Sequence, residues 1–347
     1  MRLSSHFMFK NLLANLCVGF ICLGSVLALL AYFIAPDNTP NANTMHVTLQ
    51  AKPPGYTTYM LQEVQNNNHK TSVWHQFLYG KSIFVKETPI SEYFTSTPEK
   101  ITYRPERQDE FVEIAKTEQV KVVKKTFWLG TDKYGRDLLS RLIIGARISF
   151  SIGIVAVSIS LVIGMLLGAL AGYFGGFVDS IIMWIINVTW SIPTILLVIA
   201  ITVSLGKGLW QIYVAVGLTM WVEVARVVRG QTISIKNRQY IEAAKVLGLS
   251  DFQIIIKHII PNIIGPIIVI SASNFAASIL VESGLSFLGL GAQPPTPSWG
   301  IIIKNHYNYI VTGKAFLAII PGMLIVFLVL SFMIIGNVLR DKWDVKN

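Results

Sequence analysis

The residues that could carry chemistry in this 347-residue chain are few and scattered. Glu282 is a carboxylate within a long apolar run, where a charged side chain costs about 2.5–3.5 kcal/mol. It must face protein or water or be protonated, so we consider both a role in a polar pathway or its gate and a structural hydrogen bond. Gly80, Lys81 and Ser82 match the end of a phosphate-binding loop, but His75 stands where that loop has its first glycine. We therefore reject this match.

Cys17 and Cys22 lie in one apolar run with no histidine or aspartate beside them. A metal site needs about four ligands, so we interpret both cysteines as packing residues. The sequence also lacks HExxH, GxSxG and paired catalytic carboxylates. We predict a protein that is not an enzyme, with no catalytic residue, no metal site and no cofactor of its own.

The composition is that of a membrane protein. Hydrophobic residues make up 52% of the chain and charged residues 14%, whereas soluble domains carry about 25% charged residues. The net charge of +10 would suggest nucleic acid as a partner of a soluble protein. Here the basic residues cluster between apolar runs, so we assign them to orientation in a lipid membrane and expect no nucleic acid.

Six candidate spans of about 20 apolar residues predict an all-α integral membrane protein. They are Leu13–Ala35, Ser149–Gly172, Ile181–Leu205, Gln211–Val228, Ile263–Leu290 and Phe316–Val338. The fourth is the weakest, because Glu223 and Arg226 fall in its last turns. The first exceeds the apolar core of a signal peptide and lacks a cleavage site before Pro36, so we interpret it as a retained anchor. Arg2 and Lys10 predict a cytoplasmic N-terminus, and six spans return the C-terminus to the same side.

Three features concern the geometry of these helices. Pro193 removes a backbone donor and kinks the third span beside Trp190, which indicates either a pathway lining or a structural kink. Asp137–Arg147 is amphipathic and predicts a helix in the membrane interface before the second span. Glycines every four residues predict close packing of the second span against another helix. They are Gly164, Gly168, Gly172 and Gly176.

Residues 36–127 are more polar than the rest of the chain. They are too rich in aromatic residues for a disordered linker, and Lys81–Glu87 and Lys121–Trp128 have the composition of strands. We expect a small extracytoplasmic subdomain, α/β or irregular, between an anchor (1–35) and a membrane domain (128–347).

Residues 229–261 form a basic, cytoplasmic connection between the fourth and fifth spans. Glu242–Leu247 is a strong helix former that Gly248 ends, and a capping box of Ser250–Gln253 starts a second short helix. Pro261 marks the return to the membrane. These residues alone fit either an ordinary loop or a helix–glycine–helix unit on which a partner docks.

The stretch EAAKVLG followed by HIIPN resembles the EAA loop of bacterial binding-protein-dependent ABC permeases. In that family the loop is a coupling helix that docks into the ATPase subunit. The resemblance implies this role for Glu242, Ala243, Ala244, Gly248 and Pro261. The small alanines would let a groove in the partner close over them, and Glu242 would offer a charged handle.

Three more stretches resemble the peptide-transport branch of this family, and its second permease in particular. They are Trp128–Ser149, Ala171–Ser180 and Glu282–Gly300. The resemblance implies the six-span fold of a type I ABC importer permease in the cytoplasmic (inner) membrane. It also implies a second homologous permease, two ATPase subunits that bind ATP and magnesium, and an external solute-binding protein.

Two alternatives remain open at this stage. Close relatives of peptide importers carry nickel or other small solutes, although the apolar spans here hold no histidine or cysteine cluster. An ion-coupled secondary carrier is a further alternative, because such carriers have broken helices and intramembrane charges. Neighbouring genes for ATPases and a binding protein would distinguish an ABC permease from a carrier.

Overall fold

The computed structural model describes residues 12–64, 72–81, 85–97, 100–115, 117, 119–206 and 208–344. Contacts divide the chain into two compact units. The helical unit takes its described residues from Met1–Gly24, Ser149–Gln293 and Met323–Asn347, and the sheet unit takes its own from Ser25–Ile148 and Pro294–Gly322.

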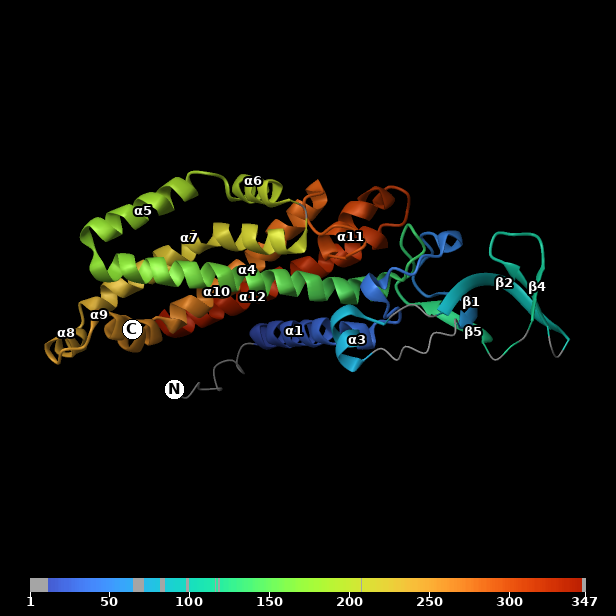
Figure 1. The fold of residues 1–347 in the computed structure, drawn as a ribbon, viewed down its shortest axis with the longest axis horizontal. Helices are drawn as coiled ribbons and strands as arrows, with labels where there is room; N and C mark the ends of the chain where they lie inside the picture. Colours follow the sequence, from blue (N-terminus) through green and yellow to red (C-terminus); the bar gives the residue numbers. More distant parts are fainter. Residues whose placement is uncertain are drawn as a thin grey trace. The chain divides into compact units, whose positions relative to one another are not determined.

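Within the described residues, five helices are long and apolar enough to span a membrane (Figure 1). They are α1 (Leu12–Leu29), α4 (Leu138–Phe174), α7 (Leu209–Lys236), α10 (Ile264–Leu288) and α12 (Phe316–Asp344). A sixth span is counted if α5 (Gly176–Trp190) and α6 (Thr194–Leu205) are taken together. The helical membrane fold expected from the sequence is confirmed.

The third predicted span is not one straight helix, because α5 and α6 meet at an angle of 89°. Pro193 has no amide hydrogen and holds the N-cap position of α6 with extended backbone. The sequence correctly locates the break at Pro193. It predicts only a kink within one helix, whereas the angle of 89° separates two helices.

Two predicted helix boundaries are also wrong. The expected interfacial helix over Asp137–Arg147 is not separate, because α4 runs without a break from Leu138. Its apolar residues Leu138 and Leu142 are buried within the sheet unit, where the indole of Trp299 donates to the Leu142 carbonyl at 2.9 Å. The second boundary concerns the fourth predicted span, which ends at Val228, whereas α7 continues to Lys236. The added residues are mostly polar, so hydropathy does not include them in the span.

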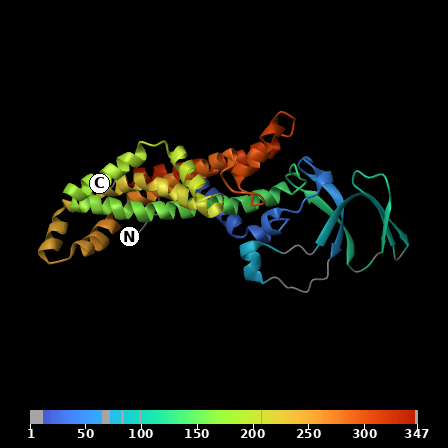
Figure 2. The same ribbon diagram turned by 45° about the horizontal axis from the view of Figure 1, so that its top comes forward.

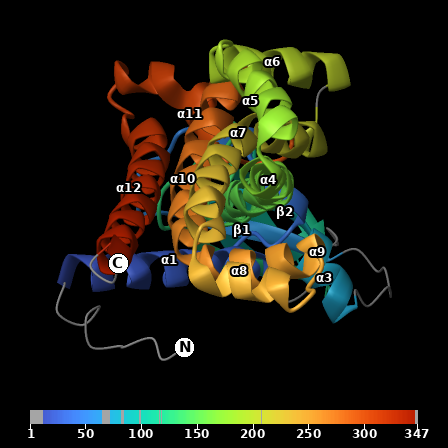
Figure 3. The same ribbon diagram turned by 90° about the vertical axis from the view of Figure 1, so that its left-hand side faces the viewer.

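Close packing of α4 on α7 forms the centre of the helical unit, and α10 packs on another side of α7 (Figure 3). A Cβ atom on Gly164 would lie 2.5 Å from Val224 Cβ, and one on Gly168 would lie 2.5 Å from the Ala225 carbonyl oxygen. Gly172 makes the same kind of approach to Arg229. These backbones can approach so closely only because the side chains are absent.

Gly176 does not belong to this packing face, and its inclusion in the prediction was wrong. Helix α4 ends at Phe174, and Gly176 begins α5 with a φ of +51°. A Cβ atom on Gly176 would meet no atom of the described residues within 4 Å. The four-residue spacing continues across a helix end that the glycine pattern alone cannot reveal.

A five-stranded antiparallel sheet dominates the sheet unit, with strand order β4-β3-β2-β1-β5 (Figure 2). The strands are β1 (Tyr56–Val64), β2 (Val85–Thr97), β3 (Lys100–Pro105), β4 (Val112–Ala115) and β5 (Val120–Phe127). Short helices accompany the sheet, namely α2 (Ala31–Ile34), α3 (Val73–Tyr79) and α11 (Trp299–His306).

Alternating side chains of β1 enter two small cores on opposite faces of the sheet. Met60 packs with Leu49 and Phe127, whereas Leu61 packs with Ile90 and Tyr103. The predicted strand Lys121–Trp128 is confirmed as β5. The predicted strand Lys81–Glu87 overlaps the start of β2 at Val85, and its residues 82–84 lie outside the described residues.

Candidate functional site

The connection between α7 and α10 folds as two short helices around a glycine. Helix α8 (Gln239–Val246) ends before Gly248, whose φ of +81° is a left-handed conformation that favours glycine. Helix α9 (Asp251–Ile254) starts with the predicted capping box, in which Ser250 and Gln253 each bond the other's backbone amide. We call residues 239–254 the coupling element.

The coupling element is fixed to the helical unit by an apolar contact and a polar one. Ile241 and Ala244, three residues apart on α8, are buried in a cluster that also contains Ile254. The hydroxyl of Tyr173, in the last turn of α4, donates to Asp251 Oδ1 at 2.5 Å. The Lys245 ammonium lies 5.2 Å from the centre of the same Tyr173 ring. Both short helices are thereby attached to one neighbouring helix end.

The predicted docking residues do not all lie on one surface. Glu242, Ala243 and Gly248 are exposed, but Ala244 is only 6% exposed. The expectation that Ala244 faces a partner is wrong, because it stands three residues after Ile241 on the face that packs inward.

Pro261 lies in a single 3₁₀ turn, Ile260–Asn262, just before α10. A π-helical turn, Ile255–Ile259, connects α9 to this turn. Proline is suited to the position because its missing amide hydrogen removes one backbone donor that would need a partner at a helix start. Pro261 is exposed and stands three residues before the start of α10, the helix predicted to re-enter the membrane.

The three candidate pathway residues do not form one surface. Glu282 is fully buried in α10 and accepts a hydrogen bond from Ser286 Oγ at 2.6 Å. Trp190 is exposed at the end of α5, and Pro193 is exposed at the start of α6. The geometry of Glu282 is that of a structural hydrogen bond within its own helix.

A second polar centre lies in the sheet unit, within the stretch Gly130–Arg141. The Arg136 guanidinium binds Asp132 Oδ2 through Nε and Nη2, both at 2.6 Å, and both side chains are buried. Nearby, Nε2 of His306 accepts the Lys133 amide at 3.3 Å, and its Nδ1 lies 2.7 Å from the Ile302 carbonyl. Burial lowers the pKa of His306, although the hydrogen bond with Ile302 opposes this effect. The pattern fits a neutral histidine protonated on Nδ1.

Comparison with known protein families assigns the chain to one of them. The description "binding-protein-dependent transport system inner membrane component" belongs to a family whose model matches residues 164–345, slightly more than half of the chain. The chain belongs to this family. The matched region contains the coupling element, α7 and α10, whereas the five strands lie before it.

Individual permeases of similar sequence agree with this membership. The chain is 42% identical over 230 residues to the dipeptide transport system permease protein DppC of Bacillus subtilis (strain 168), covering 66% of this chain and 72% of DppC. It is 42% identical over 219 residues to the glutathione transport system permease protein GsiD of Pectobacterium atrosepticum, covering 63% and 72%. Among solved structures, the inward-facing MetNI methionine ABC transporter gives a TM-score of 0.49 at 21% identity, covering 59% of this chain and 97% of that one.

Three highly exposed apolar residues of this binding-protein-dependent permease were not among the residues predicted from the sequence. Val246, Leu247 and Phe252 are 87%, 79% and 73% exposed at the tip of the coupling element. The sequence signal was local, since Val246, Leu247 and Phe252 are large apolar residues on either side of Gly248 in a connection predicted to lie outside the bilayer. Apolar residues that leave the buried face beside a glycine turn indicate a contact surface.

Proposed function

We propose that this permease forms one half of the pathway of an ATP-driven importer for short peptides. The exposed apolar tip of the coupling element is the observation that carries the proposal. Val246, Leu247 and Phe252 stand on two short helices that Tyr173 and the Ile241 cluster hold to the helical unit. A fixed apolar projection of this kind suits a groove in a partner protein, and burial there would release its water.

Partner ATPases supply the chemical energy in this proposal. They bind ATP and magnesium and press on the coupling element, where Glu242, Ala243 and Gly248 line the exposed side. The permease itself performs no hydrolysis. The permease alternates between an inward-open and an outward-open state. The change between them is driven by the difference in ATP-dependent binding of the ATPases to the two states.

The proposed assembly contains a second homologous permease, two ATPases and an external solute-binding protein. Both termini of the chain lie in the cytoplasm, and the coupling element faces the same side. The sheet unit then lies outside the cytoplasmic membrane, where it contacts the binding protein or the second permease. The exposed aromatic pair Tyr59 and Tyr93, with ring centres 5.2 Å apart, supports a contact role for the sheet.

The peptide cargo is proposed from the relatives, whose names give dipeptides and glutathione, itself a tripeptide, as substrates. The decisive measurement is uptake of labelled di-, tri- and pentapeptides by cells lacking this gene, with and without a plasmid copy. Restoration of uptake by the plasmid supports the proposal, and the preferred length defines the subtype. If cells with no other peptide importer gain no peptide uptake from the plasmid, the cargo belongs to another class, with nickel as the next solute to test.

A further inference from the structure

The middle of α7 carries a carboxylate that the fold leaves uncovered. Glu223 has 14 residues before it and 13 after it in the 28-residue helix. It is exposed, and within the described part of the chain it has no hydrogen-bond or ion-pair partner. The apolar span predicted for this helix, Gln211–Val228, includes Glu223, so the carboxylate falls within the length of α7 that crosses a bilayer.

A lipid-facing position for this carboxylate is unfavourable, because charged groups inside membranes face protein or water. Its neighbour Arg226, one turn away, does not neutralise it. The Arg226 guanidinium instead donates to Asn187 Oδ1 at 2.9 Å and lies 3.6 Å from the centre of the Trp190 ring, both on α5. The cation is therefore engaged within the helical unit, while the Glu223 carboxyl group has no partner among the described residues.

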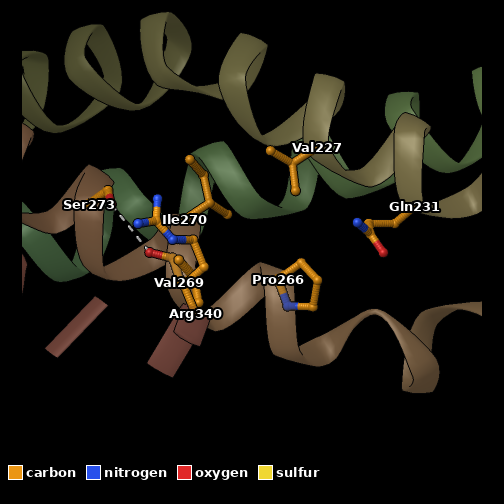
Figure 4. Close-up of a pocket in the computed structure, with 7 residues that line it drawn as sticks. All are labelled: Val227, Gln231, Pro266, Val269, Ile270, Ser273 and Arg340. Carbon is orange, nitrogen blue, oxygen red and sulfur yellow. Dashed lines mark hydrogen bonds between the residues drawn. The ribbon is translucent and has the colours of Figure 1, made fainter. Parts of the chain in front are cut away.

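The side of α7 that carries Glu223 continues toward the end of the helix with half-buried residues. Val227 and Gln231 follow at four-residue intervals and share that face. Both line a cavity of about 350 Å³ between α7, α10 and α12. Figure 4 shows the polar groups of Gln231, Ser273 and Arg340 around its apolar walls. Glu223 does not itself line this cavity but stands one turn before Val227 on α7, and the Arg340 guanidinium at the cavity lies 3.9 Å from Asp341.

This charge arrangement fits a ligand with an ammonium group. A peptide carries an α-ammonium, an apolar or polar body and a carboxylate, and the cavity walls offer both kinds of surface. We propose that Glu223 lines the translocation pathway and accepts the α-ammonium of the peptide as it passes. The inference rests on the proposed peptide import and adds a residue that selects for charge within the membrane.

The first test asks whether water and peptide reach this position. Glu223→Cys is made after Cys17 and Cys22 are replaced by serine, and the assembled importer with its ATPases is reconstituted in liposomes. A water-borne methanethiosulfonate reagent is expected to modify Glu223→Cys, and saturating tripeptide with loaded binding protein is expected to slow the modification. Val162→Cys is the matched control, because Val162 is an exposed apolar residue of the span α4. An unreactive Glu223→Cys would overturn the inference.

The second test measures transport by two variants, one that preserves the size of the side chain and one that preserves its carboxylate. Glu223→Gln is expected to lower tripeptide import by about tenfold or more, because a charge-assisted hydrogen bond is lost. Glu223→Asp keeps the carboxylate and is expected to retain most of the import. Wild-type import in the same liposomes tests the proposed function separately.

Three results would count against the inference while wild-type peptide import stands. They are import by Glu223→Gln at the wild-type rate, equal losses in Glu223→Asp and Glu223→Gln, and loss of the second permease from purified Glu223→Gln importer. The last result would assign Glu223 to an ion pair between subunits. Slowed modification of Glu223→Cys by peptide, together with rescue by aspartate, would support the inference.

Discussion

The hydroxyl of Tyr173 and the carboxylate of Asp251 are joined by a hydrogen bond of 2.5 Å, although 78 positions separate them in the sequence. The bond connects the last turn of α4 to the first residue of α9. A force applied to the tip of the coupling element is therefore transmitted to α4 through a short polar link as well as through the Ile241 cluster. The link gives the coupling element a defined orientation on the helical unit.

Loss of this link is expected to weaken coupling more than folding. Tyr173→Phe removes one hydrogen bond to a charged acceptor, which contributes about 1.5–3 kcal/mol, and leaves the aromatic packing in place. The substituted permease should insert and bind its ATPases, but it should import fewer peptides for each ATP hydrolysed. The ratio of import to hydrolysis in liposomes measures this effect. Tyr240→Phe on α8 is the matched control, and an equal fall in both variants would contradict the assignment.

The apolar tip is expected to be needed for ATPase binding. Leu247→Asp introduces a charge at a site that is already 79% exposed, so the isolated permease should remain as stable as the wild type. A charge in the buried contact with a partner should reduce co-purification of the ATPase by about tenfold or more. Val311→Asp provides the comparison, because Val311 is also highly exposed but belongs to the sheet unit. Normal ATPase recovery with Leu247→Asp would remove the tip from the docking surface.

The contact between α4 and α7 is expected to be intolerant of a methyl group. Gly168→Ala would bring Cβ to 2.5 Å from the Ala225 carbonyl oxygen, and overpacking of this kind costs about 1–3 kcal/mol. Gly230→Ala on α7 meets open space and should be neutral or stabilising by up to about 1 kcal/mol through helix propensity. Thermal unfolding of the two variants in detergent measures the difference. Equal melting temperatures would mean that α4 and α7 can separate at little cost.

The pKa of His306 predicts a pH dependence in the sheet unit. Burial lowers this pKa below its ordinary value of 6.5, so the unfolded chain binds the proton more readily than the folded one. The contribution to stability is complete above about pH 6.5 and is lost as the pH falls below that value. Protonation would also remove the Nε2 acceptor of the Lys133 amide.

Hydrogen exchange at the Lys133 amide provides the measurement for His306. His306→Gln is the reference, because glutamine does not titrate and any intrinsic pH dependence cancels in the ratio of the two exchange rates. Protection in the wild type relative to this variant should be constant above about pH 6.5 and decline as the pH falls below that value. A ratio that begins to fall above pH 6.5, or that does not fall before the sheet unit unfolds in acid, would contradict the role of His306 protonation.

The sequence predicts the coupling element well because its signals are local. Gly248 and the pair Ser250 and Gln253 specify a helix end and a helix start through bonds within a few residues. The burial of Ala244 could not be predicted in the same way, since it depends on which face of α8 meets α4. An isolated eight-residue helix shows too little periodicity to distinguish the inner face from the outer one.

The depth of Glu223 was also misjudged, for a different physical reason. Hydropathy locates the apolar part of a helix, but hydrogen bonding continues as long as the residues favour a helix. Residues 229–236 of α7 are mostly polar but stay helical, so the helix outlasts its apolar run. Glu223 and Arg226 consequently lie near the middle of α7 rather than in its last turns. In the sheet, the pairing of β1 with β5 joins strands that are distant in the sequence, which no local pattern specifies, whereas the other pairings join consecutive strands.

Helix α7 has the lowest mean hydropathy of the five long helices and the largest buried share. During synthesis, transfer of such a segment from water into lipid alone releases little free energy. Its insertion therefore depends on contacts with helices that are already in the bilayer. Helix α4, with its glycine face directed at α7, leaves the ribosome first and can receive it. The chain order thus supplies the partner before the segment that needs it.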